Sequence, residues 1–124
     1  MNVVDSCGWL EYFSDGPNAG KFAKPIQEMD TLIVPTLSMY EVFKVALRER
    51  GEDAALQAVA IMKQGQEVDL DSNLAIQAAK TSFDLKIPMA DAIILTTARA
   101  YRATVWTQDD DFAGINGVKY FQKR

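Results

Sequence analysis

The sequence predicts an α/β fold, a three-layer sandwich in which helices cover both faces of a mostly parallel sheet of short strands. Short apolar segments alternate with longer helical ones along the 124 residues, and this alternation requires crossover connections between parallel strands. Hydrophobic residues make up 48% of the chain and charged residues 24%, proportions typical of a globular protein. No linker, repeat or low-complexity segment interrupts the pattern, so we expect a single domain over residues 1–124.

Five segments have the composition of short strands. They are residues 1–4, 31–35, 67–70, 104–107 and 118–121. The second is a run of apolar and β-branched residues that ends at Pro35, which is typical of a strand buried on both faces. The third carries two acidic residues and is the least apolar, and the last has the mixed character of an edge strand.

Six segments between these strands have helical patterns. The expected helices are residues 9–13, 20–29, 37–50, 52–63, 72–86 and 89–102. A turn at residues 15–18 ends the first helix, Gly51 separates the third from the fourth, and Pro88 stands at the start of the last.

Two of these helices carry apolar faces that predict how they pack. Tyr40, Phe43 and Leu47 share one face of the third helix, which we expect at the core or at a subunit interface. The fifth helix is expected to point inward through a set of apolar residues comprising Leu74, Ala78, Ala79 and Phe83.

The chain has one cysteine and no histidine, which excludes several kinds of site. One thiol forms no internal disulfide, structural zinc usually takes four cysteine or histidine ligands, and Ser-His-Asp or Cys-His catalysis is impossible within the chain. A metal bound here needs oxygen ligands, which favours Mg²⁺, Mn²⁺ or Ca²⁺. The net charge of −4 argues against a protein that coats nucleic acid by bulk positive charge.

The sequence also argues against a membrane or secreted protein. No stretch approaches the ~20 apolar residues that span a bilayer. The N-terminal segment has no basic region and reaches Asp5 almost at once, unlike a signal peptide. We therefore expect a cytoplasmic protein with no membrane partner.

Four acidic residues are predicted to converge on one edge of the sheet. Asp5 directly follows the first strand and Asp109 follows the fourth, while Glu41 and Asp91 lie near the starts of their helices. In open α/β sheets, ligands bind at the edge formed by the carboxyl ends of the strands. Asp91 also lies on an apolar helical stripe, so its carboxylate is expected to face a site rather than bulk water.

Such a group of carboxylates suits a divalent cation. Two carboxylates ~4 Å apart repel by about 4 kcal/mol at an effective dielectric of 20, so a cluster either binds protons or holds a cation. Metal ions in such a site activate water and neutralise phosphate charge, which favours phosphodiester hydrolysis. Lys44 and Arg48 lie on roughly the same helical face as Glu41 and are candidate RNA-contacting residues.

Each of these residues also has a simpler interpretation. Glu41 and Ser38 have capping-box spacing, Asp5 is a candidate helix N-cap, and Asp91 is a candidate helix-dipole carboxylate. The acidic run at 109–111 is typical of a solvated turn, and the two basic residues suit a solvated helix face. The joint interpretation is stronger, because four independent coincidences would be needed to place the carboxylates on one edge.

Four short motifs resemble those of the PIN-domain ribonucleases. They are Asp5-Ser6 after an apolar strand, Glu41 early in the third helix, Ala90-Asp91-Ala92-Ile93, and Thr107-Gln108-Asp109-Asp110-Asp111-Phe112. They span essentially the whole chain, whose compact length resembles the VapC toxins of bacterial type II toxin–antitoxin modules. The resemblance implies a PIN-like fold and an endoribonuclease that requires Mg²⁺ or Mn²⁺ and leaves a 5′-phosphate and a 3′-hydroxyl.

The resemblance also implies roles for individual residues and partners. The residues that match the family's acidic quartet are Asp5, Glu41, Asp91 and Asp109, of which Asp5, Asp91 and Asp109 are the expected metal ligands. Asp111 matches an additional acidic position, Ser6 and Thr107 match polar residues beside the metal, and Cys7 departs from the family pattern. The implied partners are an RNA substrate, a cognate antitoxin protein and a second copy of the chain in a homodimer.

Three other functions are compatible with these residues. A phosphoacceptor receiver domain has a similar length and a Mg²⁺-binding acidic pocket, but it would place adjacent acids after the first strand, where Asp5 stands alone. A PIN-like fold also serves as a binding module without catalysis. A nuclease for DNA or flap substrates would need extra arches for which the chain has no room, so RNA is preferred.

Overall fold

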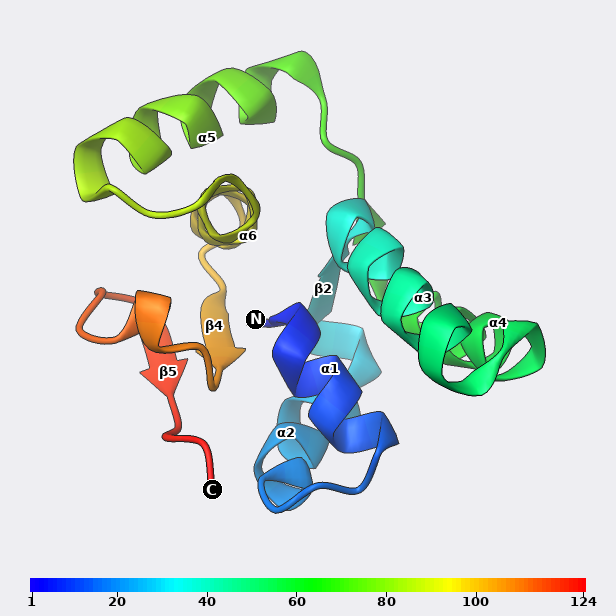
Figure 1. Ribbon diagram of the computed structural model, residues 1–124. Helices are drawn as coiled ribbons and strands as arrows, with labels where there is room; N and C mark the ends of the chain where they lie inside the picture. Colours follow the sequence, from blue (N-terminus) through cyan, green and yellow to red (C-terminus); the bar gives the residue numbers. More distant parts are fainter.

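Five short strands pair in parallel to form the central sheet (Figure 1). The computed structural model describes all 124 residues. The strands are β1 (Asn2–Val4), β2 (Leu32–Pro35), β3 (Gln66–Val68), β4 (Thr104–Thr107) and β5 (Val118–Tyr120). Their order is β3-β2-β1-β4-β5, and every neighbouring pair is parallel. The predicted α/β fold is confirmed, and each predicted strand is present within a few residues of its expected bounds.

The strand order brings two of the predicted acidic residues to one edge. β1 lies at the centre of the sheet, and Val4 of β1 is opposite Trp106 of β4. Asp5 and Asp109, which follow these two parallel strands, therefore leave the sheet at the same edge. The order also differs from the 2-1-3-4-5 order of receiver-type sheets, which argues against that alternative.

Six α-helices cover the two faces of the sheet, and none has both the length and the apolar character needed to cross a membrane. They are α1 (Ser6–Phe13), α2 (Ala19–Ile26), α3 (Thr36–Arg50), α4 (Glu52–Met62), α5 (Ser72–Leu85) and α6 (Met89–Ala100). Alternate strand residues point to opposite faces. Val3 and Val105 pack with α5 and α6, whereas Val4 and Trp106 pack with α1 to α4, which gives the three layers of Figure 1.

A glycine allows α1 to pack closely against its neighbours. A Cβ atom at Gly8 would lie 2.6 Å from the Phe22 ring of α2 and 2.8 Å from the Val4 side chain of β1. Both distances are too short for carbon atoms in contact, so only glycine fits without a shift. This close packing fixes the start of α1, which directly follows Asp5.

Only two of the four α5 residues that were predicted to point inward are buried. Leu74 and Ala78 are buried, but Ala79 is exposed and the Phe83 side chain is 83% exposed. The reason is that α5 is an outer helix that packs mainly on α6 (Figure 1), so it buries a narrow stripe. By contrast, every residue of α6 from Asp91 to Ala98 is buried.

The apolar face predicted on α3 also lies at the surface. Tyr40 is 61% exposed and Leu47 is 45% exposed, with Phe43 half-buried between them. α3 instead packs mainly on α4, and its buried residues Met39 and Val42 join the core cluster that also contains residues of the sheet, α1, α2 and α4. Of the two places expected for this face, the core of the chain is therefore excluded, and a subunit interface stays a prediction.

Two short 3₁₀ helices account for other differences in helix bounds. They are η1 (Met29–Thr31) and η2 (Asp110–Phe112). Met29 was expected at the end of the second helix and instead begins η1. η2 begins three residues after the end of β4, and it contains Asp110 and Asp111 of the acidic run, with Asp109 as its N-cap.

Candidate metal centre

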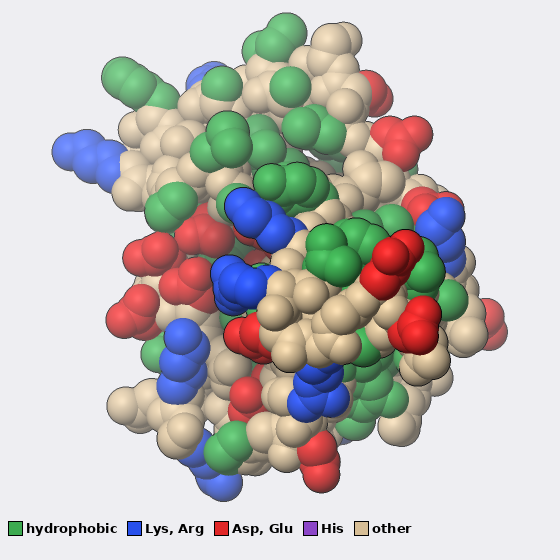
Figure 2. Space-filling view, turned by 45° about the vertical axis from the view of Figure 1, so that its right-hand side comes forward, with side chains coloured by type: hydrophobic (Ala, Val, Ile, Leu, Met, Phe, Trp, Pro, Cys, Tyr) green, Lys and Arg blue, Asp and Glu red, His purple; other side chains and the backbone are tan.

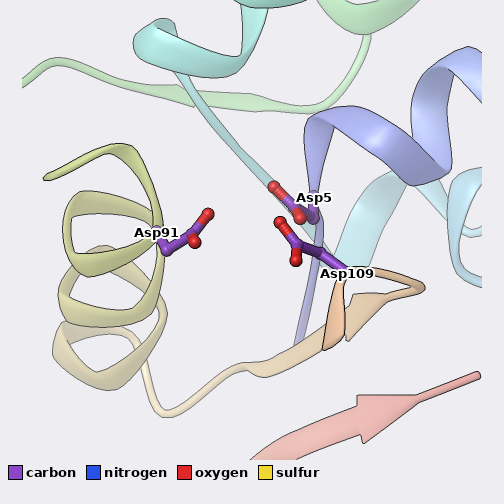
Figure 3. A group of neighbouring side chains, drawn as sticks. All are labelled: Asp5, Asp91 and Asp109. Atoms are coloured by element: carbon purple, nitrogen blue, oxygen red, sulfur yellow. The ribbon is translucent and has the colours of Figure 1, made fainter. Parts of the chain in front are cut away.

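Three carboxylates from distant parts of the chain converge at the carboxyl edge of the sheet. Asp5 follows β1, Asp91 lies in the first turn of α6, and Asp109 lies between β4 and η2. One oxygen atom from each lies within 4.8 Å of those from the other two, and Figure 3 shows the three side chains pointing toward one another. The structure thus brings together the three residues that were expected to bind metal.

Asp5 is held by hydrogen bonds from three donors. Its Oδ1 accepts from the backbone N–H of Ser6 (2.8 Å), which makes Asp5 the N-cap of α1. Its Oδ2 accepts from Thr107 Oγ1 (2.9 Å) and Cys7 Sγ (3.4 Å). Burial raises the pKa of Asp5, and these donors oppose the rise. Asp5 is therefore the N-cap of α1 and also a member of the carboxylate group, and its role as a metal ligand stays a prediction.

Asp91 has a very different environment on the opposite side of the group. Only 8% of the residue is exposed, and its buried Oδ2 has no hydrogen-bond partner. Burial, followed by the nearby charges of Asp5, Asp109 and Asp111, raises the pKa of Asp91 to about 7. A buried carboxylate oxygen without a donor is costly, so this atom needs a proton or a cation.

Asp109 is held by its own turn. Its backbone N–H donates to Thr107 Oγ1 (2.9 Å), and its Oδ1 accepts from the backbone N–H of Asp111 (3.0 Å). Asp110 and Asp111 are exposed, as expected of a solvated turn, whereas Asp109 is half-buried and faces Asp5 (Figure 3). Asp111 contributes through its charge, which helps to raise the pKa of Asp91.

Glu41 does not join the three-carboxylate group. Its Oε1 accepts a hydrogen bond from Ser6 Oγ (2.6 Å), and its charge helps to raise the pKa of Asp5. The capping box expected from Ser38 and Glu41 is absent, because α3 begins at Thr36 and Ser38 lies inside the helix. Glu41 is therefore connected to the residue that follows Asp5 by a single hydrogen bond, from Ser6.

Cys7 and Thr107 lie directly beside Asp5. Cys7 Sγ is 3.4 Å from Thr107 Oγ1 as well as from Asp5. Burial and the Asp5 charge raise the pKa of Cys7 to about 12, so the thiol stays protonated and acts as a donor. The side chain is half-buried and lies against Asp5, so the position at which the sequence departs from the family pattern still supplies a donor to the carboxylate.

The two predicted RNA-contacting residues are exposed on α3. Lys44 Nζ lies 5.8 Å from the centre of the Tyr40 ring, and Arg48 lies 3.6 Å from the Glu49 carboxylate. Figure 2 shows acidic side chains gathered on one part of the surface, with lysine and arginine side chains beside them. Basic groups beside an acidic centre suit a substrate that carries phosphates.

A groove between α1, α3 and α4 opens beside the carboxylates. It has a volume of about 440 Å³, and its lining is partly apolar, including Leu10, Phe13 and Ile61. Cys7 and Gln108 form the part of the lining nearest the centre, since each neighbours a residue of the carboxylate group. Sequence analysis did not predict this groove, because it forms only where the fold brings α1 beside the consecutive helices α3 and α4.

The donor set fits a hard divalent cation. Asp5, Asp91 and Asp109 supply carboxylate oxygens, the chain has no histidine, and the buried Asp91 Oδ2 has no partner within the protein. Carboxylate oxygens are the ligands that Mg²⁺ and Mn²⁺ prefer. These three residues would hold such an ion.

Comparisons with known proteins agree with this geometry. The model of the PIN domain family matches residues 3–118. A toxin–antitoxin complex from Klebsiella pneumoniae contains a chain with a TM-score of 0.84 and 21% identity, over 98% of this chain and 99% of that chain. VapC20 of Mycobacterium tuberculosis, a toxin that cleaves the sarcin–ricin loop, has a TM-score of 0.78 and 16% identity, over 94% and 95% of the chains.

A third solved structure, VapBC2 of Rickettsia felis bound to promoter DNA, has a TM-score of 0.74 and 12% identity, over 98% of this chain and 97% of that chain. No curated protein matches the sequence. At these identities the solved structures show a shared fold.

Proposed function

The chain belongs to the PIN domain family, and on that premise we propose that it is a metal-dependent endoribonuclease, the toxin of a toxin–antitoxin pair. The observation that carries this proposal is the group formed by Asp5, Asp91 and Asp109, in which one buried carboxylate has no partner. Two structural neighbours support the toxin assignment, since one is described as a toxin and the other as a toxin–antitoxin complex. Such an enzyme would work in the cytoplasm, where its RNA substrate is found.

Asp5, Asp91 and Asp109 are the proposed ligands of Mg²⁺ or Mn²⁺. A bound ion of this kind lowers the pKa of water and neutralises charge on phosphate oxygens. Asp5 is oriented by Ser6, Cys7 and Thr107 before any ion arrives, so this ligand pays little reorganisation cost on binding. Glu41 fixes Ser6 and adds a fourth negative charge to the same edge.

RNA is the proposed substrate, with single-stranded segments favoured. An acidic protein binds a polyanion only where cations or basic side chains offset the repulsion. Lys44 and Arg48 on α3 are proposed to contact phosphates on either side of the cleaved bond, while Asp111 and the metal ligands define the centre. Contacts to phosphates position a strand without reading its sequence.

The exposed apolar faces support a homodimer. Tyr40 and Leu47 of α3, Ile76 and Phe83 of α5, and Met89 of α6 are each more than 40% exposed. Exposed apolar side chains in such numbers are typical of an interface. α3 and α5 carry apolar residues at helical spacing that stay exposed in the single chain, and a dimer interface would bury them.

The groove between α1, α3 and α4 is the proposed seat of an antitoxin segment. Its apolar lining suits the apolar face of a helix or an extended peptide, and Glu11, Glu49 and Arg50 supply polar contacts at its rim. Because Cys7 and Gln108 line the end nearest the carboxylates, a bound segment would extend to the centre and block access.

The test is cleavage of total cellular RNA by the purified protein without its partner, in Mg²⁺, in Mn²⁺ and in EDTA. We expect fragments with 5′-phosphate and 3′-hydroxyl ends that disappear in EDTA and with the Asp91→Asn variant. Metal binding without any cleavage, at several protein concentrations and with single-stranded and structured RNA, would instead identify a binding module.

A further inference from the structure

A buried amide links the turn before α2 to the segment that carries Asp109. Asn18 is completely buried, and its Nδ2 donates to Gln108 Oε1 (2.9 Å) and to the backbone carbonyl of Gln122 (3.1 Å). Gln108 is itself 8% exposed and lies between Thr107 and Asp109. The Asn18 side chain thus binds two residues that lie 90 and 104 positions further along the chain.

The local structure holds Asn18 in this orientation. Its backbone N–H donates to Glu11 Oε2 (2.7 Å), and Gly16 leaves the space that the Glu11 carboxylate occupies, since a Cβ there would lie 2.4 Å from Oε1. Although Asn18 precedes α2, its side chain makes no capping hydrogen bond. The amide therefore acts on Gln108 and Gln122 rather than on its own helix.

Asp109 needs such support more than the other two carboxylates do. Asp5 caps α1 and Asp91 lies within α6, so regular structure places both side chains. Asp109 lies where the chain leaves β4 and caps only η2, a 3₁₀ helix of three residues, through the hydrogen bond from the backbone N–H of Asp111. Repulsion from Asp5 and Asp91, whose oxygens lie within 4.8 Å, pushes this segment outward. Gln108 is the residue of the segment that is anchored to another part of the fold.

We propose that Asn18 and Gln108 are positioning residues that hold Asp109 against the repulsion of the other carboxylates. The hydrogen bond from Asn18 fixes Gln108, and Gln108 fixes the backbone from which the Asp109 side chain extends. The consequence for metal binding rests on the proposed function, whereas the consequence for the backbone does not. The buried Oδ1 of Asn18 has no hydrogen-bond partner, which lowers the stability of the protein. Packing alone therefore does not explain an asparagine at this position.

The first test measures backbone amide exchange in the metal-free protein by NMR. In Asn18→Ala we expect the Asp109 amide, which donates to Thr107 Oγ1, to exchange at least about fivefold faster than in the wild type. Gln108→Met removes the same acceptor with little change in volume and should have the same effect. If Asn18→Ala does not fold, this second variant decides.

The matched control is Asn2→Ala. Asn2 Oδ1 accepts a hydrogen bond of 2.8 Å from Trp106 Nε1, so this variant also removes one side-chain tether of β4, but on the residue before Thr107. We expect the Asp109 amide of Asn2→Ala to exchange within about twofold of the wild type, at a comparable loss of stability. Equal exchange at Asp109 in all variants, or equal acceleration in the control, would overturn the proposal.

The second test measures Mn²⁺ affinity by calorimetry on the same variants. We expect the Kd to rise about tenfold in Asn18→Ala and Gln108→Met, as for the loss of a partner that orients a ligand. The control should stay within about twofold of the wild type. If the wild type binds no Mn²⁺, the proposed function fails while the exchange result still decides whether Asn18 positions Asp109. An unchanged Kd with accelerated exchange would overturn the consequence for metal binding and support the positioning of the backbone.

Discussion

The two sides of the carboxylate group differ in how the protein treats a buried negative charge. On the β1–α1 side, Asp5 accepts hydrogen bonds from Ser6, Cys7 and Thr107. On the α6 side, Asp91 is equally buried, yet one of its oxygens has no donor. The hydrogen-bond donors around Asp5 therefore offset part of the cost of burying its charge, although burial still raises its pKa. One oxygen of Asp91 has no such donor and needs a proton or a cation.

This difference indicates how the centre divides its tasks. A ligand that is already oriented and hydrogen-bonded binds without reorganisation, which favours affinity. A ligand with a raised pKa binds a proton when no cation is present, which limits repulsion in the empty protein. The pKa of both carboxylates is raised. They differ in that donors of the protein already orient Asp5, which is thus the preformed ligand, whereas Asp91 has one buried oxygen for which a cation would supply the missing partner.

The largest effect that would test this comparison is expected from Asp91→Asn. Loss of a ligand removes several kcal/mol of transition-state stabilisation, so we expect RNA cleavage to fall by about a thousandfold or more. The same variant should be more stable than the wild type at pH 8 without metal. A folded-state pKa raised to about 7 means that the native state holds its proton longer, so stability falls as pH rises from about 4 to 7. Asparagine removes that loss.

Asp5→Asn is the matched comparison for this prediction. We expect a similar loss of cleavage but lower stability, because an amide NH₂ in place of Oδ2 would face the Thr107 and Cys7 donors. Thermal unfolding of both variants in EDTA at pH 8 measures the difference. Stability changes of the same sign in the two variants would contradict the contrast between Asp5 and Asp91.

The second effect is the pH dependence of metal affinity. Below the pKa of Asp91, a cation must displace a proton from this carboxylate. We expect the Kd for Mn²⁺ to rise about tenfold for each pH unit below 7, and to level off above it. Calorimetry in two buffers of different ionisation enthalpy should show a net release of protons at pH 6. A Kd independent of pH between 5 and 8 would show that Asp91 is ionised without the metal.

The third effect concerns the preformed side and is expected to be smaller. Thr107→Val removes the donor to Asp5 Oδ2 and the acceptor for the Asp109 amide, and it keeps the side-chain shape. We expect Mn²⁺ affinity and cleavage each to fall by about tenfold, as for other residues that orient ligands. Thr97→Val is a suitable control, because Thr97 Oγ1 donates only to the carbonyl of Ile93 inside α6. Equal effects from the two variants would return Thr107 to a purely structural role.

The sequence was sufficient to predict how the site assembles from strand ends. Asp5 and Asp109 follow apolar segments that pair in parallel, so their convergence depends on strand order alone. Glu41 was placed at the same edge, but the direction of its side chain depends on Ser6, which lies 35 residues away. Local spacing also suggested a capping box, and the true start of α3 at Thr36 excludes it.

Features that depend on tertiary partners could not be predicted in this way. The periodicity of α5 located its apolar residues, but which of them are buried depends on how narrowly α6 contacts it, and Phe83 remains exposed. The link from Asn18 to Gln108 joins residues 90 positions apart and has no local signal beyond two polar side chains. Cys7 lies at the site because α1 begins immediately after Asp5.

The smallest effect is expected from the basic residues, which extend the comparison to the substrate. Lys44 and Arg48 belong to α3, the helix that also carries Glu41, which is hydrogen-bonded to Ser6 next to Asp5. Their positive charges are therefore on the Asp5 side of the carboxylate group. We expect Lys44→Ala to weaken RNA binding by a few-fold and to lower the slope of log K against log salt by about 1. Arg48→Ala should have less effect, because Arg48 already lies 3.6 Å from the Glu49 carboxylate.

Binding of a single-stranded oligonucleotide to the Asp91→Asn protein, at a series of salt concentrations, measures both effects without cleavage. Lys80→Ala serves as control, since Lys80 is an exposed lysine on α5, the outer helix on the α6 side. A salt slope that falls for Lys44→Ala alone would place the RNA over α3 and the preformed ligand. Equal slopes for Lys44→Ala and the wild type would make Lys44 part of a solvated face, with the metal ligands then accounting for substrate binding.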